Sequence, residues 1–469
     1  MTKLYLQLSY QIEQQIDENL ILPSEKLPSI RTIMASHGVA KNTVISALND
    51  LEKKGIIFAK AKVGFFVSPR RNTQHQLPNQ HFPNLESQAV SLTDIFYDVM
   101  NKEAAFDIVP NDSTALPSQH LISLNKHIRR AYRQQIPFRS SHYDTPKGHV
   151  TLREQLSHRY RLRGINIDVE SFCITSGCQH SLMLALMATC KQGDTVAVET
   201  PTFYGSLLLL EQLKLNVVEV SSHPVTGLDI EHLTQALEKT QITACIVTPN
   251  FATPTGSLMP EDNKNRLLSL ANDCDFAVIE DDIYGEISFA DPTSSLLSFD
   301  TQERVIVCSS MSKALSKDIR IGWIIGSRWQ KQIEQLKLTS ILACSSSIQS
   351  GVAEFMASGD YRKHINYTQH TLQQQMLTLT QLLTDYWPSC TRFTKPLGGI
   401  SLWVELAHPI NSLAIYHKLL KDNIVITPGL LFSHRSNYQH CIRLSFQHAF
   451  NKKRVEAIKT IGKTITASL

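Results

Sequence analysis

The sequence predicts an α/β protein that is preceded by a small domain of helices and a hairpin. From about residue 93, short apolar runs alternate with segments of helical spacing, which is typical of a largely parallel sheet covered by helices. Before residue 69 the apolar spacing is mainly helical. A chain of 469 residues is too long for one compact core, so two or three domains are expected.

The first domain should occupy residues 1–68. Its predicted elements are helices over 4–22, 29–37 and 42–54, followed by a hairpin with strands 56–59 and 64–67. Pro23 cannot continue the first helix, and Gly38 and Gly55 follow the ends of the other two. Residues 69–91 are polar, contain three prolines and lack periodicity, so they predict a linker.

The second domain should extend over residues 92–469. The runs that predict a mixed, mainly parallel seven-stranded sheet are 172–175, 195–199, 216–220, 243–248, 276–280, 304–308 and 321–326. After about residue 340 the pattern becomes richer in helices, which predicts a smaller α+β subdomain. Its strand candidates are 400–406, 424–429 and 441–446.

Composition and charge narrow the class of protein. The chain has no signal-peptide-like apolar region and no apolar run that could span a bilayer, so we expect a cytoplasmic protein without membrane contact. The nine cysteines form no CxxC pair, and apolar surroundings predict buried thiols at Cys245 and Cys308 rather than a metal site. Residues 1–71 carry ten Lys/Arg and six Asp/Glu, whereas the other 398 hold 36 of each. The first domain alone therefore has the basic charge of a nucleic-acid-binding module.

The second and third predicted helices have the organisation of a helix-turn-helix. In that motif the first turn of the second helix, here Lys41-Asn42-Thr43, enters the major groove. Asn42 can read base edges, and Lys41 and Thr43 can contact phosphate. Further candidate DNA contacts are Arg31 on the preceding helix and Lys60 and Lys62 on the wing. A helical oligomerisation domain with a basic surface is the alternative.

This segment resembles the GntR-type winged helix. The match consists of LPSIRTIM, GVAKNTVISALNDLEKKGII and GFFV, in that order within residues 4–68. Ala40 departs from the family, which usually has Ser or Thr at this position. Because alanine has no side-chain oxygen, it cannot cap the recognition helix, and a lost cap typically costs ~1 kcal/mol.

A second group of motifs begins with Lys313, in the sequence SMSK after the apolar run 304–308, with Arg320 seven residues later. The spacing resembles S-x-S-K-x-x-x-P-x-x-R-x-G of fold-type I aminotransferases. This resemblance implies that Lys313 forms an aldimine with pyridoxal 5'-phosphate (PLP) and that Arg320 binds its phosphate. Lys317 stands where the family usually has proline. The cofactor contacts implied by the motif come from Ser310, Ser312, Lys313 and Arg320.

A carboxylate must keep the pyridine nitrogen of PLP protonated so that the ring can accept electrons. Asp281 follows the apolar run 276–280 and precedes Tyr284 in a D-x-x-Y pattern. The resemblance gives Asp281 this role and gives Tyr284 a hydrogen bond to the ring oxygen. Asp282 is the alternative carboxylate, although the spacing to Tyr284 favours Asp281.

Ser176, Gly177 and Cys178 follow the first strand of the predicted sheet and open a helical segment. Backbone amides at a helix start form a phosphate site, and glycine permits close approach. Their position resembles the phosphate loop of the family. Phe203 resembles the aromatic residue that stacks on the cofactor ring, and Tyr204 is the alternative.

Three further positions resemble the family. Thr253 occupies the place of Asn in an Asn-Pro-x-Gly motif whose Asn bonds the ring oxygen, and Asn250 is a candidate to compensate. Tyr143 resembles the tyrosine that reaches the phosphate of the neighbouring subunit, which implies a homodimer. Arg443 resembles the arginine that clamps the α-carboxylate of the substrate.

The complete chain resembles the MocR subfamily of GntR-type regulators, in which a winged helix precedes an aminotransferase-like domain. The resemblance implies a regulator that binds a double-stranded DNA operator and PLP and senses an amino acid or amine effector by aldimine exchange at Lys313. An active aminotransferase with an appended DNA-binding domain is one alternative, because Lys313, Asp281 and Arg443 are all present. A regulator that senses PLP itself is another.

Overall fold

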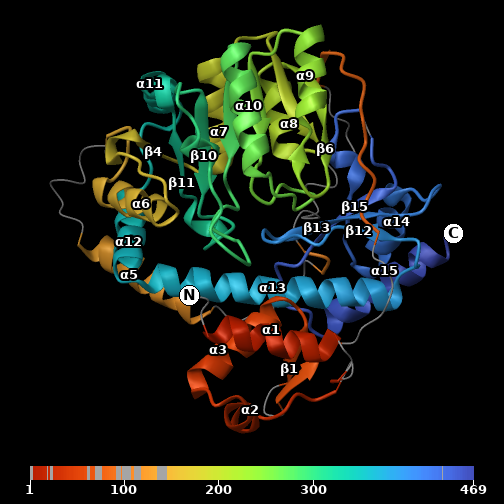
Figure 1. The fold of residues 1–469 in the computed structure, drawn as a ribbon. Coiled ribbons are helices and arrows are strands. Elements are labelled where there is room, and N and C mark those ends of the chain that lie inside the picture. Colours follow the sequence, from red (N-terminus) through yellow and green to blue (C-terminus); the bar gives the residue numbers. More distant parts are fainter. Residues whose placement is uncertain are drawn as a thin grey trace. The chain divides into compact units, whose positions relative to one another are not determined.

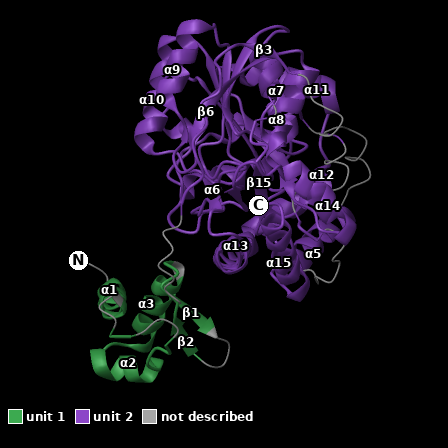
Figure 2. Ribbon diagram, turned by 90° about the vertical axis from the view of Figure 1, so that its right-hand side faces the viewer, with its two compact units in different colours: residues 1–75 green, residues 76–469 purple. Residues whose placement is uncertain are grey.

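The computed structural model describes residues 4–17, 20–21, 25–60, 64–68, 76–90, 97, 107–109, 118–134, 145–435 and 437–469. It divides the chain into two compact units, unit 1 with residues 1–75 and unit 2 with residues 76–469 (Figure 2). Unit 1 has a hydrophobic core of its own, and unit 2 has two large apolar clusters.

Unit 1 combines helices with a two-stranded antiparallel hairpin. Its elements are α1 (Leu4–Asp17), α2 (Ile30–His37), α3 (Lys41–Lys53), β1 (Ile57–Lys60) and β2 (Gly64–Val67). The apolar faces of α1 and α3 share one core, whose buried members include Leu8, Ile12, Ile16, Val44, Ala47, Leu48 and Leu51. α1 ends at Asp17 rather than at residue 22, and the amide of Leu20 turns back to the carbonyl oxygen of Gln15 at 2.9 Å.

The ends of α2 and α3 follow from local chemistry. The Ser29 hydroxyl accepts a hydrogen bond from the Thr32 amide at 3.2 Å and so caps α2. Gly38 ends that helix with a φ of 64°, in the left-handed region that glycine tolerates. Ala40 occupies the N-cap position of α3 and makes no side-chain capping bond. The recognition helix therefore begins without the cap that the family usually has.

Unit 2 contains a nine-stranded sheet. Its strands lie in the order β3 (Gln88–Ala89), β6 (Asn216–His223), β5 (Thr195–Thr200), β8 (Ala244–Val247), β9 (Ala277–Asp281), β10 (Val305–Ser310), β11 (Gly322–Ile325) and β4 (Phe172–Thr175), and β7 (Gly227–Leu228) pairs with β6. The strands from β6 to β10 run parallel, whereas β11 is antiparallel to both of its neighbours. The seven predicted strands are therefore confirmed, and β3 and β7 are additional short strands.

Helices cover both faces of this sheet (Figure 1). They include α6 (Val150–Leu162), α7 (Cys178–Thr189), α8 (Tyr204–Gln212), α9 (Ile230–Lys239), α10 (Glu261–Asp273) and α11 (Gln330–Ile341). α5 (Gln119–Arg133) packs against α12 (Ser346–Ala357), which also contacts α6. Because successive residues of a strand point to opposite faces, Val307 and Cys308 of β10 belong to different cores. Cys245 and Cys308 are buried, as predicted. Among the described helices, none has the length and apolar character needed to cross a membrane.

The C-terminal part of unit 2 forms a small subdomain around a four-stranded antiparallel sheet. Its strands lie in the order β12 (Arg392–Phe393), β13 (Ser401–Glu405), β15 (Cys441–Ser445) and β14 (Thr427–Pro428). The accompanying helices are α13 (Asp360–Tyr386), α14 (Ser412–Leu419) and α15 (Lys452–Thr466). Figure 1 shows the long helix α13 running from the region of α5 and α12 to α15. The predicted α+β subdomain is thus present.

Part of the segment that the sequence predicts as a linker lies on unit 2. Residues 76–90 belong to that unit, and within them β3 pairs antiparallel with the edge strand β6. An open sheet edge offers unpaired backbone groups that an extended segment can use, whatever its side chains. The low periodicity of residues 69–91 is therefore compatible with an extended segment, but it does not show where that segment packs.

Candidate cofactor site and DNA-binding surface

The candidate cofactor residues converge at the carboxyl ends of the parallel strands. Asp281 is the last residue of β9, and Ser310 is the last residue of β10. Ser310 and Thr175 both pair with Gly322, so the segments that follow β10 and β4 are close although they are far apart in the sequence. In α/β proteins this edge of the sheet is the usual place for a ligand.

Arg320 lies against the start of α7. Its Nη2 donates to the carbonyl oxygen of Ser176 at 2.9 Å. A Cβ on Gly177 would lie 2.7 Å from the same nitrogen, and Gly177 also has a φ of 90°, so this approach requires glycine. The first amides of a helix have no partner within the helix. The helix start and the guanidinium together therefore present donors that suit a phosphate.

Two serines shape the loop that carries Lys313. The Ser312 amide donates to the Ser310 hydroxyl at 3.0 Å, and this hydroxyl donates to the carbonyl oxygen of Ile321 at 3.1 Å. Lys317, which stands in the place of a proline, begins a short 3₁₀ turn that leads to Arg320. The loop is thus tied to β11 at its base, and a proline is not needed to define its path.

Lys313 is half-buried among charged groups. Burial and the nearby Arg443 lower the pKa of Lys313 to about 7, with further lowering by Arg320 and Lys317 and an opposing effect of Asp281. An amine with such a pKa is in large part uncharged near neutral pH, and the uncharged amine is the form that attacks a carbonyl group.

Asp281 is 5% exposed and lies beside the start of α7. Its Oδ1 accepts a hydrogen bond from the Cys178 thiol at 3.2 Å. Burial raises the pKa of Asp281 to about 6, and the bond from Cys178 opposes that rise. The same residue, Cys178, therefore belongs to the candidate phosphate loop and contacts the carboxylate proposed for the ring nitrogen.

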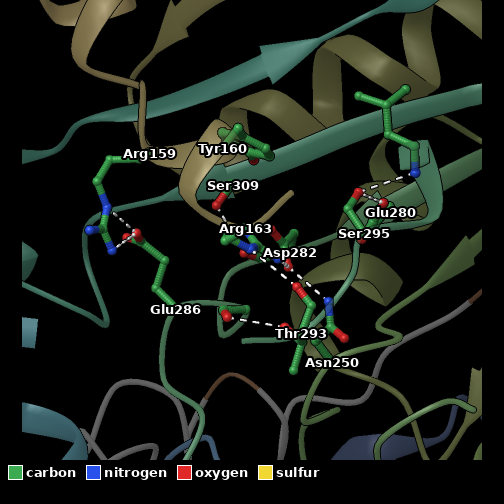
Figure 3. Close-up of polar contacts among 12 residues, drawn as sticks. Arg159, Tyr160, Arg163, Asn250, Glu280, Asp282, Glu286, Thr293, Ser295 and Ser309 are labelled. Atoms are coloured by element: carbon green, nitrogen blue, oxygen red, sulfur yellow. Dashed lines mark hydrogen bonds and ion pairs between the residues drawn. The ribbon is translucent and has the colours of Figure 1, made fainter. Parts of the chain in front are cut away.

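Asp282 is bonded into a separate buried network (Figure 3). Arg163 Nη1 donates to Asp282 Oδ2 at 2.6 Å, and Asn250 Nδ2 donates to Asp282 Oδ1 at 3.1 Å. The Ser309 hydroxyl holds the backbone carbonyl of Asp282 at 2.9 Å. Of the two adjacent carboxylates, Asp282 thus forms a structural ion pair, whereas Asp281 is the one beside Lys313.

Thr253 and Tyr284 form a buried pair, in which the Thr253 hydroxyl donates to the Tyr284 oxygen at 3.0 Å. Burial raises the pKa of Tyr284, so its hydroxyl keeps its proton. Asn250 does not compensate for the missing Asn, because its amide donates to Asp282 and to the carbonyl oxygen of Ser294, each at 3.1 Å. Thr253 and Tyr284 therefore remain the candidates for the ring oxygen.

Phe203 packs close to the candidate phosphate loop. A Cβ on Gly205 would lie 2.3 Å from Phe203 Cε1, and Gln179 of the first turn of α7 donates to the carbonyl oxygen of Gly205 at 2.7 Å. Tyr204, the alternative, is buried and hydrogen bonds with Arg443. Phe203 is thus the aromatic residue next to the loop, and Tyr204 is the one next to the arginine.

Arg443 is a buried cation on the small subdomain, 2% exposed. Its Nη2 donates to the Thr427 hydroxyl at 3.3 Å, and its guanidinium carbon lies 5.5 Å from the centre of the Phe432 ring. It is close enough to lower the pKa of Lys313. Thr427 and Phe432 could not be predicted from the sequence, because their contacts with Arg443 depend on how β14 and the following turn pack.

The candidate DNA contacts of unit 1 gather at the start of α3. Lys41 and Asn42 are exposed and Thr43 is half-buried, while Arg31 is exposed on α2. The apolar side of α3 is turned to the core. The remaining predicted positions, namely the side chain of Lys60 and the whole of Lys62 and Tyr143, lie outside the described residues.

The donors of the unit 2 site fit PLP group by group. The cradle of Gly177 and Arg320 suits the phosphate, because a larger residue than glycine would fill it. The ionisable, buried Asp281 suits a pyridinium nitrogen, and the lowered pKa of Lys313 suits a lysine that condenses with an aldehyde.

The family comparisons agree with this geometry. The aminotransferase class I and II family matches residues 113–459, and the gntR family of bacterial regulatory proteins matches residues 4–67. The kynurenine aminotransferase of Pyrococcus horikoshii has a similar structure, with a TM-score of 0.73 and 26% identity over 81% of this chain and 95% of that chain. Its fold is one of PLP-dependent enzymes.

Relatives of similar length carry both parts. The HTH-type transcriptional regulator YjiR of Escherichia coli is 31% identical over 98% of this chain and 98% of its own. The HTH-type transcriptional regulator NorG of Staphylococcus aureus is 27% identical over 93% of this chain and 98% of its own. The chain therefore belongs to the aminotransferase class I and II family and, within it, to the transcriptional regulators of MocR type that begin with a GntR winged helix.

Proposed function

We propose that this regulator binds PLP through Lys313 and uses the bound cofactor to sense an amino acid or an amine. The observation that carries the proposal is the convergence of Asp281 at the end of β9, the Lys313 loop that follows β10 and the buried Arg443, with both charged groups close enough to affect the pKa of Lys313. An effector with an amino group would displace Lys313 from the cofactor. An effector that also has a carboxylate would meet Arg443, which can bind it through two hydrogen bonds.

In this proposal the remaining residues of the site hold the phosphate and the ring of the cofactor. Arg320, Ser310, Ser312 and the amides at 176–178 bind the phosphate, and Asp281 keeps the ring nitrogen protonated. Phe203 covers the ring, and Thr253 and Tyr284 bond its oxygen. When bound, PLP supplies an electron sink and an aldehyde that reacts with amines.

Unit 1 would bind a double-stranded DNA operator in the cytoplasm. The start of α3, with Lys41, Asn42 and Thr43, would enter the major groove, and Arg31 would contact the backbone. Lys60 and Lys62 of the wing would reach the minor groove. Two copies would bind as a homodimer, in which Tyr143 completes the phosphate site of the other subunit.

Substitution of Lys313 tests the proposal. The Lys313→Ala variant should lose the absorbance of the lysine-bound cofactor, and the affinity for an operator fragment should no longer change when amino acids are added to the PLP-loaded protein. An effector can shift the DNA-binding equilibrium only through different affinities for two states. An unchanged response in Lys313→Ala would refute sensing at this lysine.

A working aminotransferase is the second candidate, because Lys313, Asp281 and Arg443 are together in this site. A single-turnover experiment with an amino acid should then convert the cofactor to its amine form at about 1 per second or faster. Titration of operator affinity with PLP alone, without any amine, separates the third possibility, in which the cofactor itself is the signal.

A further inference from the structure

The extended segment 76–90 contacts both subdomains of unit 2. Figure 1 shows it in orange, running along the edge of the large sheet near β6 and on to the small sheet. Residues 69–75 connect this segment to the winged helix in the sequence. Residue 76 is therefore the first residue of unit 2 on the chain that leads to unit 1.

The first residues of the segment are bonded to the small subdomain. The backbone amide and the side-chain Nδ2 of Asn79 donate to the two carboxylate oxygens of Glu405, each at 2.7 Å. Arg392 Nη1 donates to Asn79 Oδ1 at 2.6 Å, and Arg392 Nε donates to Gln76 Oε1 at 3.1 Å. These are hydrogen bonds with one charged partner, which are stronger than those between neutral groups.

The following residues are bonded to the large sheet and its helices. Gln80 Nε2 donates to Asp229 Oδ2 at 2.8 Å and to the Ser221 hydroxyl at 3.0 Å. The Ser221 hydroxyl in turn donates to the carbonyl oxygen of His81 at 2.7 Å. Farther along, β3 pairs with β6. The small subdomain also reaches this half, since Arg435 Nη2 donates to the carbonyl oxygen of Glu86 at 2.9 Å and the rings of His81 and Tyr438 lie 5.4 Å apart.

The side chains of the adjacent residues Asn79 and Gln80 are bonded to different subdomains. A shift of the small subdomain relative to the large one would therefore strain the chain at this point. Arg443, which is close enough to Lys313 to lower its pKa, is in β15, and β15 pairs with the strand β13 that carries Glu405. A ligand bound between Lys313 and Arg443 therefore acts on the same small sheet.

We propose that residues 76–90 are a coupling strap, which converts ligand-dependent movement of the small subdomain into a displacement of the chain that leads to the DNA-binding unit. The strap regulates the site described above and so rests on the proposed function. Its two clasps are Asn79 with Glu405 and Arg392 on one side, and Gln80 with Asp229 and Ser221 on the other. Loss of either clasp removes one of the two opposed side-chain attachments at Asn79 and Gln80 and should weaken the response of the strap to their relative movement.

The experiment uses the full chain loaded with PLP and a duplex that the wild-type protein enriches from a randomised DNA pool. Aminooxyacetate serves as the probe ligand, because its amino group condenses with the cofactor aldehyde and releases Lys313, and its carboxylate suits Arg443. Fluorescence anisotropy gives the operator affinity with and without the probe. For the wild type we expect the two affinities to differ by about fivefold or more, the usual lower limit of measurable coupling between sites.

The variants Asn79→Ala and Gln80→Ala remove the side-chain hydrogen bonds of the two clasps separately, and we expect both to reduce the affinity ratio towards 1. Their cofactor absorbance and its change with the probe should match the wild type, which shows that each variant folds and binds ligand. Asn84→Ala is the matched control, because Asn84 is exposed in the same segment and its side chain makes no hydrogen bond to any residue that the structure describes.

The outcomes separate the two proposals. A wild-type protein whose operator affinity ignores the probe overturns the proposed sensing and the strap with it. A responsive wild type with equally responsive Asn79→Ala and Gln80→Ala variants overturns the strap alone. A ratio that also collapses in Asn84→Ala shows a general sensitivity of the segment and likewise counts against the two clasps.

Discussion

The start of α3 carries an exposed lysine, whereas the carboxyl edge of the large sheet carries a half-buried one. Lys41 is exposed at the first turn of a helix, where a permanent cation can meet phosphate. Lys313 is half-buried beside Arg443, and its pKa is lowered to about 7, which suits a nucleophile. The candidate DNA-binding surface thus depends on exposed, local residues, whereas the candidate cofactor site depends on burial and on partners that are distant in the sequence.

The largest effect should come from Asp282, whose carboxylate stabilises the fold beside the site but is not proposed to contact the cofactor. Asp282 is 3% exposed and pairs with the buried Arg163. Asp282→Asn keeps the shape but leaves the guanidinium charge without its partner, which should lower the free energy of unfolding of unit 2 by about 3–5 kcal/mol. Urea denaturation followed by tryptophan fluorescence measures this change. An unchanged free energy of unfolding would show that the ion pair does not stabilise unit 2.

The neighbouring substitution Asp281→Asn should weaken cofactor binding much more than it weakens the fold. We expect PLP affinity to fall about 10-fold to 100-fold, because the pyridinium nitrogen loses a charged hydrogen-bond partner. Stability without cofactor should fall far less than in Asp282→Asn, because no arginine depends on Asp281 among the described ion pairs. Equilibrium titration of the cofactor absorbance tests the first expectation. Equal losses in the two variants would contradict the division of roles.

Cofactor loading should also depend on pH in the way that a buried lysine requires. With the pKa of Lys313 lowered to about 7, the uncharged amine is scarce at pH 6 and dominant at pH 8. The rate of condensation with PLP should therefore rise about tenfold between pH 6 and pH 8 and then level off. For a lysine with the reference pKa, the rate would continue to rise through pH 9.

Stopped-flow absorbance measures this rate. The control is Arg443→Gln, which removes a cation beside the amine. Because that cation lowers the pKa of Lys313, its removal should move the rise in rate to higher pH. A profile that stays at the same pH in Arg443→Gln would show that Arg443 does not contribute to the lowered pKa of Lys313.

The same contrast explains how much could be predicted from the sequence. The seven strands and the helix-turn-helix follow from periodicity, and Lys313 and Asp281 follow from spacing within short motifs. The pairing of Arg163 with Asp282 joins residues 119 positions apart and leaves no periodic trace. For that reason the sequence leaves Asn250 open as a candidate for the ring oxygen, although its amide is committed to Asp282. The docking of 76–90 was likewise invisible, because an extended segment pairs through its backbone.

The smallest effect concerns unit 1, where the missing cap of α3 can be restored. Ala40→Ser places a hydroxyl at the N-cap, where the backbone is already extended with a φ of −68° and a ψ of 152°. The capping bond should stabilise unit 1 by about 1 kcal/mol. Differential scanning calorimetry of the full chain should show the transition of unit 1 at a higher temperature and that of unit 2 unchanged. Ala35→Ser, the same change at an exposed position inside α2, controls for the serine itself. It should bring no gain in stability, because a serine inside a helix has no unpaired helix-start amide to cap.

If Ala40→Ser raises stability but leaves operator affinity unaltered, the cap affects folding alone. A tighter operator complex would show that the serine hydroxyl also contacts the phosphate backbone.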